Sequence, residues 1–235
     1  MRVGVVIPAL NEASTIAGTL RHTAGLGFDE IVVIDGGSHD QTQALVEAVR
    51  DDPTHAARSV IQLLSTSRGR AKQLNAGAKA CRSDVLLFLH ADTRLPDNAR
   101  DAIERALADP DVGGGRFNVH FDSPSPWGFV ISAFMNFRSR LTRIATGDQA
   151  LFVRRQLFER LSGFADIPLM EDVDFSARLK RAGPTAALSE SVTTSFRRWQ
   201  QHGPLRTILL MWALRFLYWI GVSPSRLAQF YTTVR

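Results

Sequence analysis

The sequence contains very little cysteine and no apolar run long enough to cross a membrane. Cys81 is the one cysteine in 235 residues, which excludes an intramolecular disulfide. The apolar run after Met1 and Arg2 is too short for a signal peptide. These absences predict a reducing, cytoplasmic location, with contact to the inner face of the membrane as an open alternative. Because 45% of the residues are hydrophobic, the chain can close a core without cross-links, which excludes a disordered chain.

Lysine is scarce, and acidic residues are missing from the C-terminal fifth of the chain. Residues 191–235 contain six arginines and no Asp or Glu, although the net charge of the whole chain is only +5. The remainder of the chain is therefore close to neutral. Such an asymmetry suits an anionic partner such as a nucleotide, a lipid headgroup or nucleic acid, or it reflects a general preference for arginine over lysine.

Short apolar runs alternate with helical patterns in the first half of the chain. Strand-length runs rich in β-branched residues or leucine occur at Val3–Ile7, Ile31–Ile34, Val60–Leu64 and Val85–Leu89. Helical spacing is found at 14–24, 38–49 and 70–81, and the Ser38 hydroxyl is predicted to cap the second helix. This alternation predicts an open, doubly wound α/β sheet that is covered on both faces and binds ligands at the carboxyl ends of its strands.

The second half of the chain indicates that the sheet becomes mixed. Strands are expected at 116–121 and 150–153, and helices at 96–107, 127–137 and 171–181. We therefore expect one Rossmann-like domain over residues 1–202, with a mostly parallel sheet and helices on both faces. A C-terminal apolar helical appendage is expected over residues 203–235.

Polar residues follow three of the predicted strands. Asn11 and Glu12 follow the first strand, Asp35 ends the second, and His90 and Asp92 follow the fourth. These strand ends meet at one edge of a parallel sheet, so we expect the polar side chains to share a crevice. Asp35 can accept a hydrogen bond from a base or ribose, and Asp92 offers a hard oxygen ligand to Mg²⁺ or Mn²⁺. The alternative is that these residues only cap helices.

The motifs around these positions resemble those of inverting family 2 glycosyltransferases with the GT-A fold. The similar segments, in family order, are Pro8-Ala-Leu-Asn11-Glu12, Val33-Ile-Asp35-Gly-Gly-Ser38, Gly69-Arg70-Ala-x-Gln73-x-Asn75-x-Gly77, Leu89-His90-Ala-Asp92, Gly147-Asp148-Gln149, Met170-Glu171-Asp172 and Ser195-Phe-Arg197-Arg198-Trp199. The resemblance covers nearly the whole chain. In its details the chain is most similar to a bacterial subgroup whose genes accompany radical-SAM, selenium-related or arsenosugar pathways.

The resemblance implies transfer of a sugar from a nucleoside diphosphate donor, usually UDP-linked, with inversion at the anomeric carbon. The residues that it assigns to the donor are Pro8, Ala9, Asn11, Glu12, Asp35, Gly36, Arg70, Asn75, Ala91, Arg197 and Arg198. It assigns Asp172, beside Glu171, as the general base. On the acceptor side it assigns Asp148, Gln149 and Trp199. Acids such as Glu171 and Asp172 also stabilise a helix dipole when they lie in the first turn, without any catalytic role.

The metal motif departs from the family pattern, because His90 stands where the first Asp of Asp-x-Asp is usual. The resemblance implies Asp92 as a ligand of Mn²⁺ or Mg²⁺. An imidazole suits Mn²⁺ better than Mg²⁺, so either Asp92 acts alone with phosphate oxygens and water, or His90 joins it. His90 can instead hydrogen-bond a phosphate or ribose, or be a satisfied histidine at a strand end.

Two other functions compete with sugar transfer. A nucleotidyltransferase also couples a mixed α/β sheet to a metal-binding acid, but its glycine-rich opening loop and a nearby lysine are not found in this sequence. A catalytically silent module would keep the nucleotide-sugar motifs and bind the donor without turnover. The acceptor is not identified by the sequence.

The apolar run at 208–222 contains Arg215 as its only charged residue. Its fifteen residues are fewer than the ~20 that span a bilayer, so a transmembrane helix is not expected. The alternatives are packing on the catalytic domain, a homodimer contact, or a helix lying in the membrane surface. Apolar residues around nearly the whole circumference favour contact with protein. Nucleic acid is not expected as a partner, because apolar segments separate the arginines of this tail.

Overall fold

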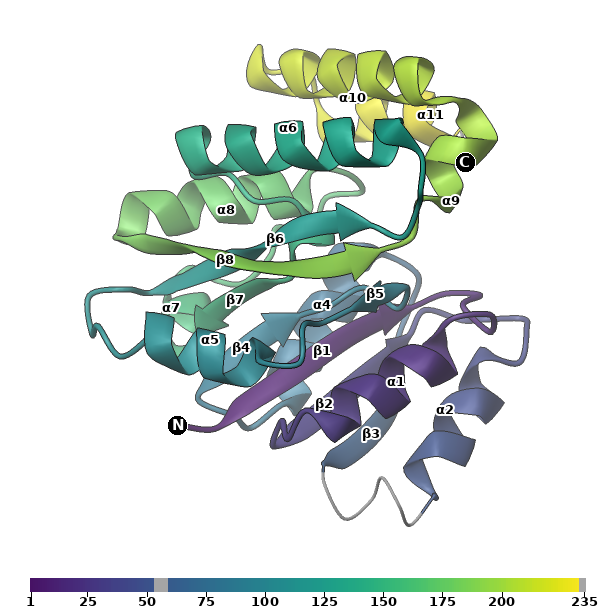
Figure 1. Ribbon diagram of the computed structural model, residues 1–235, viewed down its shortest axis with the longest axis vertical. Coiled ribbons are helices and arrows are strands. Elements are labelled where there is room, and N and C mark those ends of the chain that lie inside the picture. Colours follow the sequence, from purple (N-terminus) through teal and green to yellow (C-terminus); the bar gives the residue numbers. More distant parts are fainter. Residues whose placement is uncertain (53–58, 233–235) are drawn as a thin grey trace.

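A mixed sheet forms the centre of the protein, and helices cover both of its faces (Figure 1). The computed structural model describes residues 1–52 and 59–232; the side chain of Arg198, one of the predicted donor residues, lies outside the description. Within these ranges the sheet has eight strands in the order β3-β2-β1-β4-β7-β6-β8-β5. The strands are β1 Val3–Ala9, β2 Glu30–Asp35, β3 Val60–Ser65, β4 Val85–Phe88, β5 Thr93–Arg94, β6 Gly114–Phe121, β7 Leu151–Arg154 and β8 Thr185–Thr194.

The strand directions confirm a mixed, mostly parallel sheet. Strands β3, β2, β1 and β4 run parallel to one another. Strand β7 runs antiparallel to both of its neighbours, β4 and β6. On the far side, β8 is parallel to β6, and β5 pairs antiparallel with β8 at the edge. The carboxyl ends of β1, β2 and β4 therefore point toward the same edge of the sheet.

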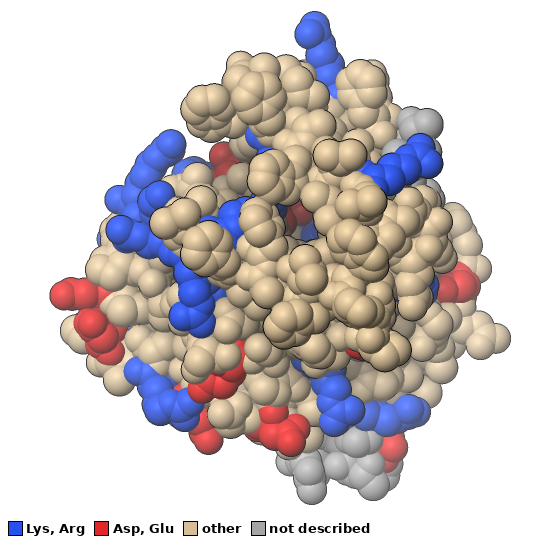
Figure 2. Space-filling model, turned by 45° about the horizontal axis from the view of Figure 1, so that its top comes forward, with Lys and Arg blue, Asp and Glu red and all other residues tan. Residues whose placement is uncertain are grey.

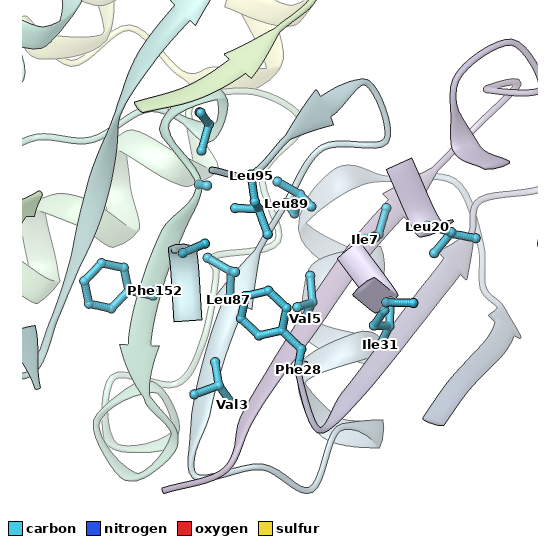
Figure 3. Packing of buried hydrophobic residues seen from close by; sticks show 14 of the residues in the cluster. Val3, Val5, Ile7, Leu20, Phe28, Ile31, Leu87, Leu89, Leu95 and Phe152 are labelled. Atoms are coloured by element: carbon cyan, nitrogen blue, oxygen red, sulfur yellow. The ribbon is translucent and has the colours of Figure 1, made fainter. Parts of the chain in front are cut away.

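Two apolar cores lie on the two faces of the sheet, because successive strand residues point to opposite sides. Val5 and Ile7 pack with helices α1 (Ile16–Gly25), α2 (Thr42–Arg50) and α5 (Ala99–Ala106) on one face. Val6 packs with α4 (Arg70–Ala80), α7 (Arg155–Arg160) and α8 (Glu171–Ala182) on the other. Figure 3 shows the first core, with the Phe28 ring among the strand residues. The remaining helices of the described ranges are α6 Pro126–Thr142, the 3₁₀ helix η1 Gly147–Gln149, α9 Arg197–His202, α10 Pro204–Trp219 and α11 Pro224–Thr232.

Helix α4 lies close against the sheet because Gly77 has no side chain. A Cβ atom on Gly77 would lie 2.4 Å from Cγ1 of Val6. This close approach brings Gln73, one turn earlier, to the strand ends. There Nε2 of Gln73 donates to the carbonyl oxygens of Ala9 at 2.8 Å and Ile34 at 2.9 Å. Helix α4 thereby holds the ends of β1 and β2 together.

Two local predictions are wrong. Strand β3 is largely exposed along one face because it lies at the edge of the sheet, whereas the sequence predicts coverage on both faces. Helix α2 begins at Thr42, and Ser38 does not cap it. The Ser38 hydroxyl donates to Asp35, and the carboxylate of Asp40 accepts the hydrogen bond from the Thr42 N–H at 2.9 Å.

The C-terminal helices pack on their own chain. Trp212 of α10 stacks on Phe134 of α6, with ring centroids 5.5 Å apart. Leu214 of α10 and Leu227 of α11 are buried beside Met170, which precedes α8. No helix in the described ranges is long and apolar enough to cross a membrane. Packing of α10 and α11 on the rest of the chain is therefore present, while the homodimer and membrane contacts stay predictions.

Candidate active site

The loop after β2 is organised by the carboxylate of Asp35, which is fully buried. This carboxylate accepts hydrogen bonds from the backbone N–H groups of Gly37 and Ser38, both at 3.0 Å, and from Nε2 of Gln43 at 2.7 Å. Burial acts to raise the pKa of Asp35, but the hydrogen bonds from Ser38, Gln43 and Gly37 outweigh it and lower the pKa. Asp35 is thus an ionised group at the end of β2.

The loop after β1 is tied to the loop after β2. Asn11 has a left-handed backbone with φ of 56°. Its N–H donates to Oγ of Ser38, and its Oδ1 accepts from the His39 N–H, both at 2.9 Å. The Gly36 N–H donates to the carbonyl of Ala9 at 2.9 Å. These bonds bring the predicted donor residues Ala9, Asn11 and Gly36 to one edge of the sheet.

Two further predicted donor residues lie near the same strand ends. Pro8 is half-buried within β1. Ala91, between β4 and β5, is buried, and its carbonyl accepts a hydrogen bond from the Thr19 hydroxyl at 2.7 Å. The contribution of Ala91 to a crevice is therefore limited to backbone and a methyl group.

Glu12 and Asp92 place two carboxylates near each other at this edge. Both residues are half-buried. Burial raises the pKa of Glu12, and the negative charge of Asp92 raises it further. Nη2 of Arg197, at the start of α9, lies 3.8 Å from Oε2 of Glu12. The sheet edge at the ends of β1 and β4 thus contains one acidic pair and one nearby guanidinium.

Arg70 lies at the N-terminus of α4 among three carboxylates. Its Nε is 3.2 Å from Oε1 of Glu171, which is buried. Burial acts to lower the pKa of Arg70, but the charges of Glu171, Asp172 and Asp148 outweigh it and raise the pKa. Burial raises the pKa of Glu171, although the positive charge of Arg70 acts to lower it. Arg70 is therefore a permanent cation between the strand ends and the start of α8.

His90, Asp148 and Gly147 form a second cluster next to Arg70. Nδ1 of His90 lies 3.2 Å from Oδ1 of Asp148. Its Nε2 is buried and has no hydrogen-bond partner in the described part of the chain. A Cβ atom on Gly147 would lie 2.5 Å from this Nε2 and 2.2 Å from Nη2 of Arg70. Only a glycine at position 147 allows both side chains to approach the η1 backbone so closely.

Asp172 lies in the first turn of α8, next to η1. Met170 precedes the helix with φ of 70°, a left-handed conformation that turns the chain into α8. Oδ2 of Asp172 accepts a hydrogen bond from the Gly147 N–H at 2.7 Å, and Oδ1 accepts from the Val173 N–H at 2.7 Å. The carboxylate is therefore held in one orientation, and it lines a cavity.

That cavity, which we call the α6–α10 cavity, has a volume of about 350 Å³ and lies between the sheet edge and the helices α6 and α10. Its polar lining includes Arg70, His90, Asp148, Glu171 and Asp172. The remaining lining is mostly apolar and comes from α6, α10 and the segment before α8. Figure 2 looks toward the face formed by the upper helices of Figure 1, which is largely uncharged with Lys and Arg toward its edges.

Some predicted site residues lie outside the cavity. Nε2 of the fully buried Gln149 donates to Oγ of Ser139 at 2.9 Å, so its amide is used within the core. The side chain of Asn75 bonds the backbone of Phe164 in both directions, at 2.8 and 2.9 Å. These contacts hold neighbouring segments in place. Trp199, in contrast, does line the cavity, and its ring packs edge-on against Phe121.

Arg138 and Arg215 line the same cavity and were not identified from the sequence. A signal was present in the spacing. Val130, Phe134 and Arg138 follow one another at intervals of four in α6, so a single arginine ends an otherwise apolar stripe. Arg215 is likewise the single charge within the apolar part of α10. The sequence does not show that the two arginines lie close enough for the charge of Arg215 to act on Arg138.

A family model described as glycosyl transferase family 2 matches residues 4–161. An undecaprenyl-phosphate 4-deoxy-4-formamido-L-arabinose transferase of Pseudomonas fluorescens (strain SBW25) is 31% identical over 150 residues, which cover 61% of this chain and 40% of that protein. The probable glycosyltransferase YdaM of Bacillus subtilis (strain 168) is 24% identical over 224 residues, which cover 84% of this chain and 52% of that protein. The chain thus spans about half or less of these relatives.

Solved structures with a similar fold include two glycosyltransferase complexes. The mannosyltransferase PcManGT from Pyrobaculum calidifontis, in complex with GDP-Man and Mn²⁺, is 26% identical with a TM-score of 0.64, covering 82% of this chain and 56% of that one. TarS of S. aureus, in complex with UDP, is 17% identical with a TM-score of 0.66, and the match covers 83% of this chain and 60% of that one. The second likeness concerns the fold alone.

Proposed function

The chain belongs to glycosyl transferase family 2 and has the GT-A fold, and from this premise we propose that it transfers a sugar from a nucleoside diphosphate sugar to an acceptor with inversion. The donor is proposed to lie at the ends of β1, β2 and β4, near Asn11, Asp35 and Arg70. The acceptor is proposed to enter the α6–α10 cavity. The donor base is proposed to be uracil, as predicted from the sequence. A GDP-linked donor is the alternative, because the similar structure of PcManGT contains GDP-Man.

The observation that carries the proposal is the position of Asp172. Its carboxylate lines the cavity, is fixed by the Gly147 N–H, and lies beside the Arg70 and Glu171 pair. In the proposed reaction, this carboxylate takes the proton of an acceptor hydroxyl. The acceptor oxygen then forms a bond to the anomeric carbon while the bond from that carbon to the β-phosphate oxygen breaks, and the nucleoside diphosphate leaves. Attack opposite to the leaving group inverts the anomeric configuration.

The donor atoms at the site fit a divalent cation that is shared with the diphosphate. No group of three or more His, Cys, Asp or Glu in the described residues could hold a metal ion alone. Asp92 supplies a half-buried carboxylate. His90 is engaged by Asp148 through Nδ1, and its Nε2 packs against Gly147, which favours Asp92 as the sole protein ligand. One carboxylate plus phosphate oxygens is a usual set for Mg²⁺ or Mn²⁺. When bound, such an ion neutralises charge on the leaving diphosphate.

The test compares Asp172→Asn with Asp174→Asn. Asparagine keeps an oxygen that can accept from Gly147 but cannot take a proton at neutral pH. We expect Asp172→Asn to leave donor affinity nearly unchanged and to lower turnover by roughly two to four orders of magnitude. Asp174 pairs with Arg178 at 2.6 Å on the same helix and is not part of the cavity lining, so its variant should keep wild-type turnover.

The measurement is release of nucleoside diphosphate from UDP-glucose, UDP-GlcNAc and GDP-mannose with Mn²⁺, with water as the default acceptor. Binding without release by the wild-type protein, across these donors and a broad acceptor panel, would favour the silent binding module. Loss of donor binding in Asp172→Asn, with turnover per bound donor intact, would place Asp172 in the donor site. Membership of the radical-SAM or arsenosugar subgroup and the cytoplasmic location stay predictions from the sequence.

A further inference from the structure

Exposed large hydrophobic residues are concentrated on two helices. Within residues 1–52 and 59–232, sixteen such residues are exposed, and eleven of them belong to α6 or α10. Figure 2 looks toward this side of the molecule, where most of the surface is uncharged and Lys and Arg lie toward the edges. Large apolar patches with a polar rim mark interaction sites on protein surfaces.

The exposed residues form one stripe on each helix, because they recur at intervals of three and four. The stripe on α6 consists of Trp127, Val130, Phe134, Phe137 and Leu141. The stripe on α10 consists of Leu205, Leu209, Trp212, Phe216 and Trp219. The two helices lie side by side, and the stripes meet where Phe134 stacks on Trp212 (Figure 1). We call the two stripes together the α6–α10 face.

Helix α10 is apolar on both sides, but the described part of the chain covers only one of them. Thr207 and Leu214 on its inner side are buried. On its outer side, the side chains of Leu209 and Trp219 are 70% and 81% exposed. A helix that is apolar around its whole circumference is stable when both sides are covered. The α6–α10 face therefore favours a further apolar environment on its outer side.

The charges next to the α6–α10 face are all positive. Residues 123–147 and 191–235, which include both helices, contain no Asp or Glu. Arg140 on α6 and Arg206 on α10 are exposed, and by their helical positions they lie beside the stripes, not within them. An apolar face bordered by cations complements a lipid surface, which is apolar below a layer of anionic headgroups.

A second copy of the chain fits this face less well. A two-fold dimer would place the same face of both copies against each other. Arginines would then meet arginines without any acid from either helix, and like charges at an interface are costly. The tryptophans also favour lipid, because three of the four in the chain, Trp127, Trp212 and Trp219, belong to this face. Tryptophan is enriched at the boundary between membrane and water.

We propose that the α6–α10 face binds the surface of an anionic lipid membrane. Both helices lie in the plane of the membrane, the two stripes enter the boundary between headgroups and acyl chains, and Arg140 and Arg206 contact lipid phosphates. This arrangement needs no membrane-spanning helix, in agreement with the described ranges, where none is long and apolar enough. The proposal does not depend on the proposed function, because it involves neither the donor nor Asp172.

The experiment measures binding of the full chain to phosphatidylglycerol vesicles by co-sedimentation, with phosphatidylcholine vesicles for comparison. We expect binding to phosphatidylglycerol to be at least tenfold tighter. Its affinity should fall at least tenfold between 0.1 and 0.5 M salt, because salt screens the exposed arginines. Equal affinity for phosphatidylcholine, or an affinity that is indifferent to salt, would overturn the proposal.

Apolar variants separate insertion of the stripes from simple attraction of charge. Phe137→Ser and Leu209→Ser keep the net charge, and neither residue lines the α6–α10 cavity. Each should weaken binding to phosphatidylglycerol by about tenfold, the worth of burying one large apolar side chain. The matched control is Leu64→Ser on the edge strand β3, where the side chain is 41% exposed, and its binding should be unchanged. Equal binding by all three variants would refute insertion, and thermal unfolding shows that each is folded.

Charge variants locate the contact with the headgroups. Arg140→Gln and Arg206→Gln should each weaken binding about fivefold. The control is Arg82→Gln, because Arg82 is exposed and its N–H donates to Glu30 at the amino end of β2, at 2.7 Å. In Figure 1 the start of the chain and this end of the sheet lie far from α10. A loss in Arg82→Gln as large as in the helix variants would show that binding follows net charge, and would overturn the proposal.

Tryptophan fluorescence tests whether the face enters the lipid. Brominated acyl chains should quench the emission of the wild-type protein on phosphatidylglycerol vesicles. Trp219→Phe keeps an aromatic side chain, so it should bind with an affinity within about threefold of wild type and show less quenching. Bound protein without any quenching by brominated acyl chains would contradict the proposed orientation.

Two more measurements separate this proposal from its alternatives. Sedimentation velocity without vesicles should show a monomer; a dimer that Leu209→Ser dissociates, together with no vesicle binding, would assign the face to a second copy. Release of nucleoside diphosphate is measured on the same protein. Vesicle binding without such release would leave the membrane surface standing and count against sugar transfer, whereas release without vesicle binding would refute only the membrane surface.

Discussion

Adding one methyl group at Gly147 tests how closely the active-site side chains approach η1. The new Cβ of Gly147→Ala would lie 2.2 Å from Nη2 of Arg70 and 2.5 Å from Nε2 of His90, and both groups must then move. The arginine tip moves easily, because its side chain is 39% exposed. The His90 ring is 17% exposed and paired with Asp148, so it resists. Overpacking of this kind costs about 1–3 kcal/mol, and we expect the lower half of that range.

Urea unfolding measures the cost. With a slope near 3 kcal/mol/M, a loss of roughly 1–2 kcal/mol lowers the midpoint by roughly 0.3–0.7 M without changing the slope. Turnover should fall by about 10²-fold, since the Gly147 N–H also holds Asp172 and small misplacements of a catalytic group are costly. The control is Gly18→Ala in α1, where nothing lies within 4 Å of the added Cβ, so stability should rise by about 0.4–1 kcal/mol. A Gly147→Ala protein with wild-type stability and turnover would refute the close-approach argument.

Three other expectations follow from single groups. Burial raises the pKa of Cys81 to about 11, so its thiol should react with a disulfide reagent at pH 8 only as fast as the protein unfolds; rapid reaction of the folded protein would contradict this. Asp92→Ala should weaken donor binding in the presence of Mn²⁺ and leave metal-free binding unchanged, as measured by calorimetry. Because hydrogen bonds lower the pKa of Asp35 below its unfolded value of 3.8, its ionised form stabilises the fold fully above that pH and less as pH falls through the folded pKa. Asp35→Asn should therefore reduce the loss of urea stability between pH 6 and pH 3, and an unchanged loss would count against this assignment.

The sheet could be predicted because its central strands are continuous apolar runs. Val3–Ile7 and Ile31–Ile34 face helices on both sides, and their side chains are fully buried, as expected for such runs in a covered parallel sheet. Val60–Leu64 has the same composition but lies at the edge, where β3 has a neighbour only on one side. Strand order is a long-range property that local composition does not encode. Coverage of β3 on both faces was wrongly predicted because its edge position cannot be read from its own residues.

The positions of the candidate site residues could be predicted where they lie at a strand end or a helix start, and not where they depend on hydrogen-bond partners. Their roles stay predictions. Asp172 follows from its place in the motif, while Gln149, two residues after Gly147, turns into the core and bonds Ser139. The Ser38 hydroxyl could cap α2 or bond Asp35, and only the folded loop decides between them. The charge of Arg215 acts on Arg138 only because α6 and α10, which are about a third of the chain apart in sequence, lie beside each other.

The contribution of α10 to the cavity sets an order on how the protein is assembled during synthesis. The whole sheet, η1 and Asp172 precede Pro204–Trp219 in the chain and are therefore synthesised before it. A chain that ends before α10 lacks one wall of the cavity, and Phe134 and Met170 are left without the partners that α10 supplies. Cleavage by a protease before α10 would recreate the same state. Donor binding and transfer would then be separable, because the proposed donor side lies outside the segment that completes the proposed acceptor side.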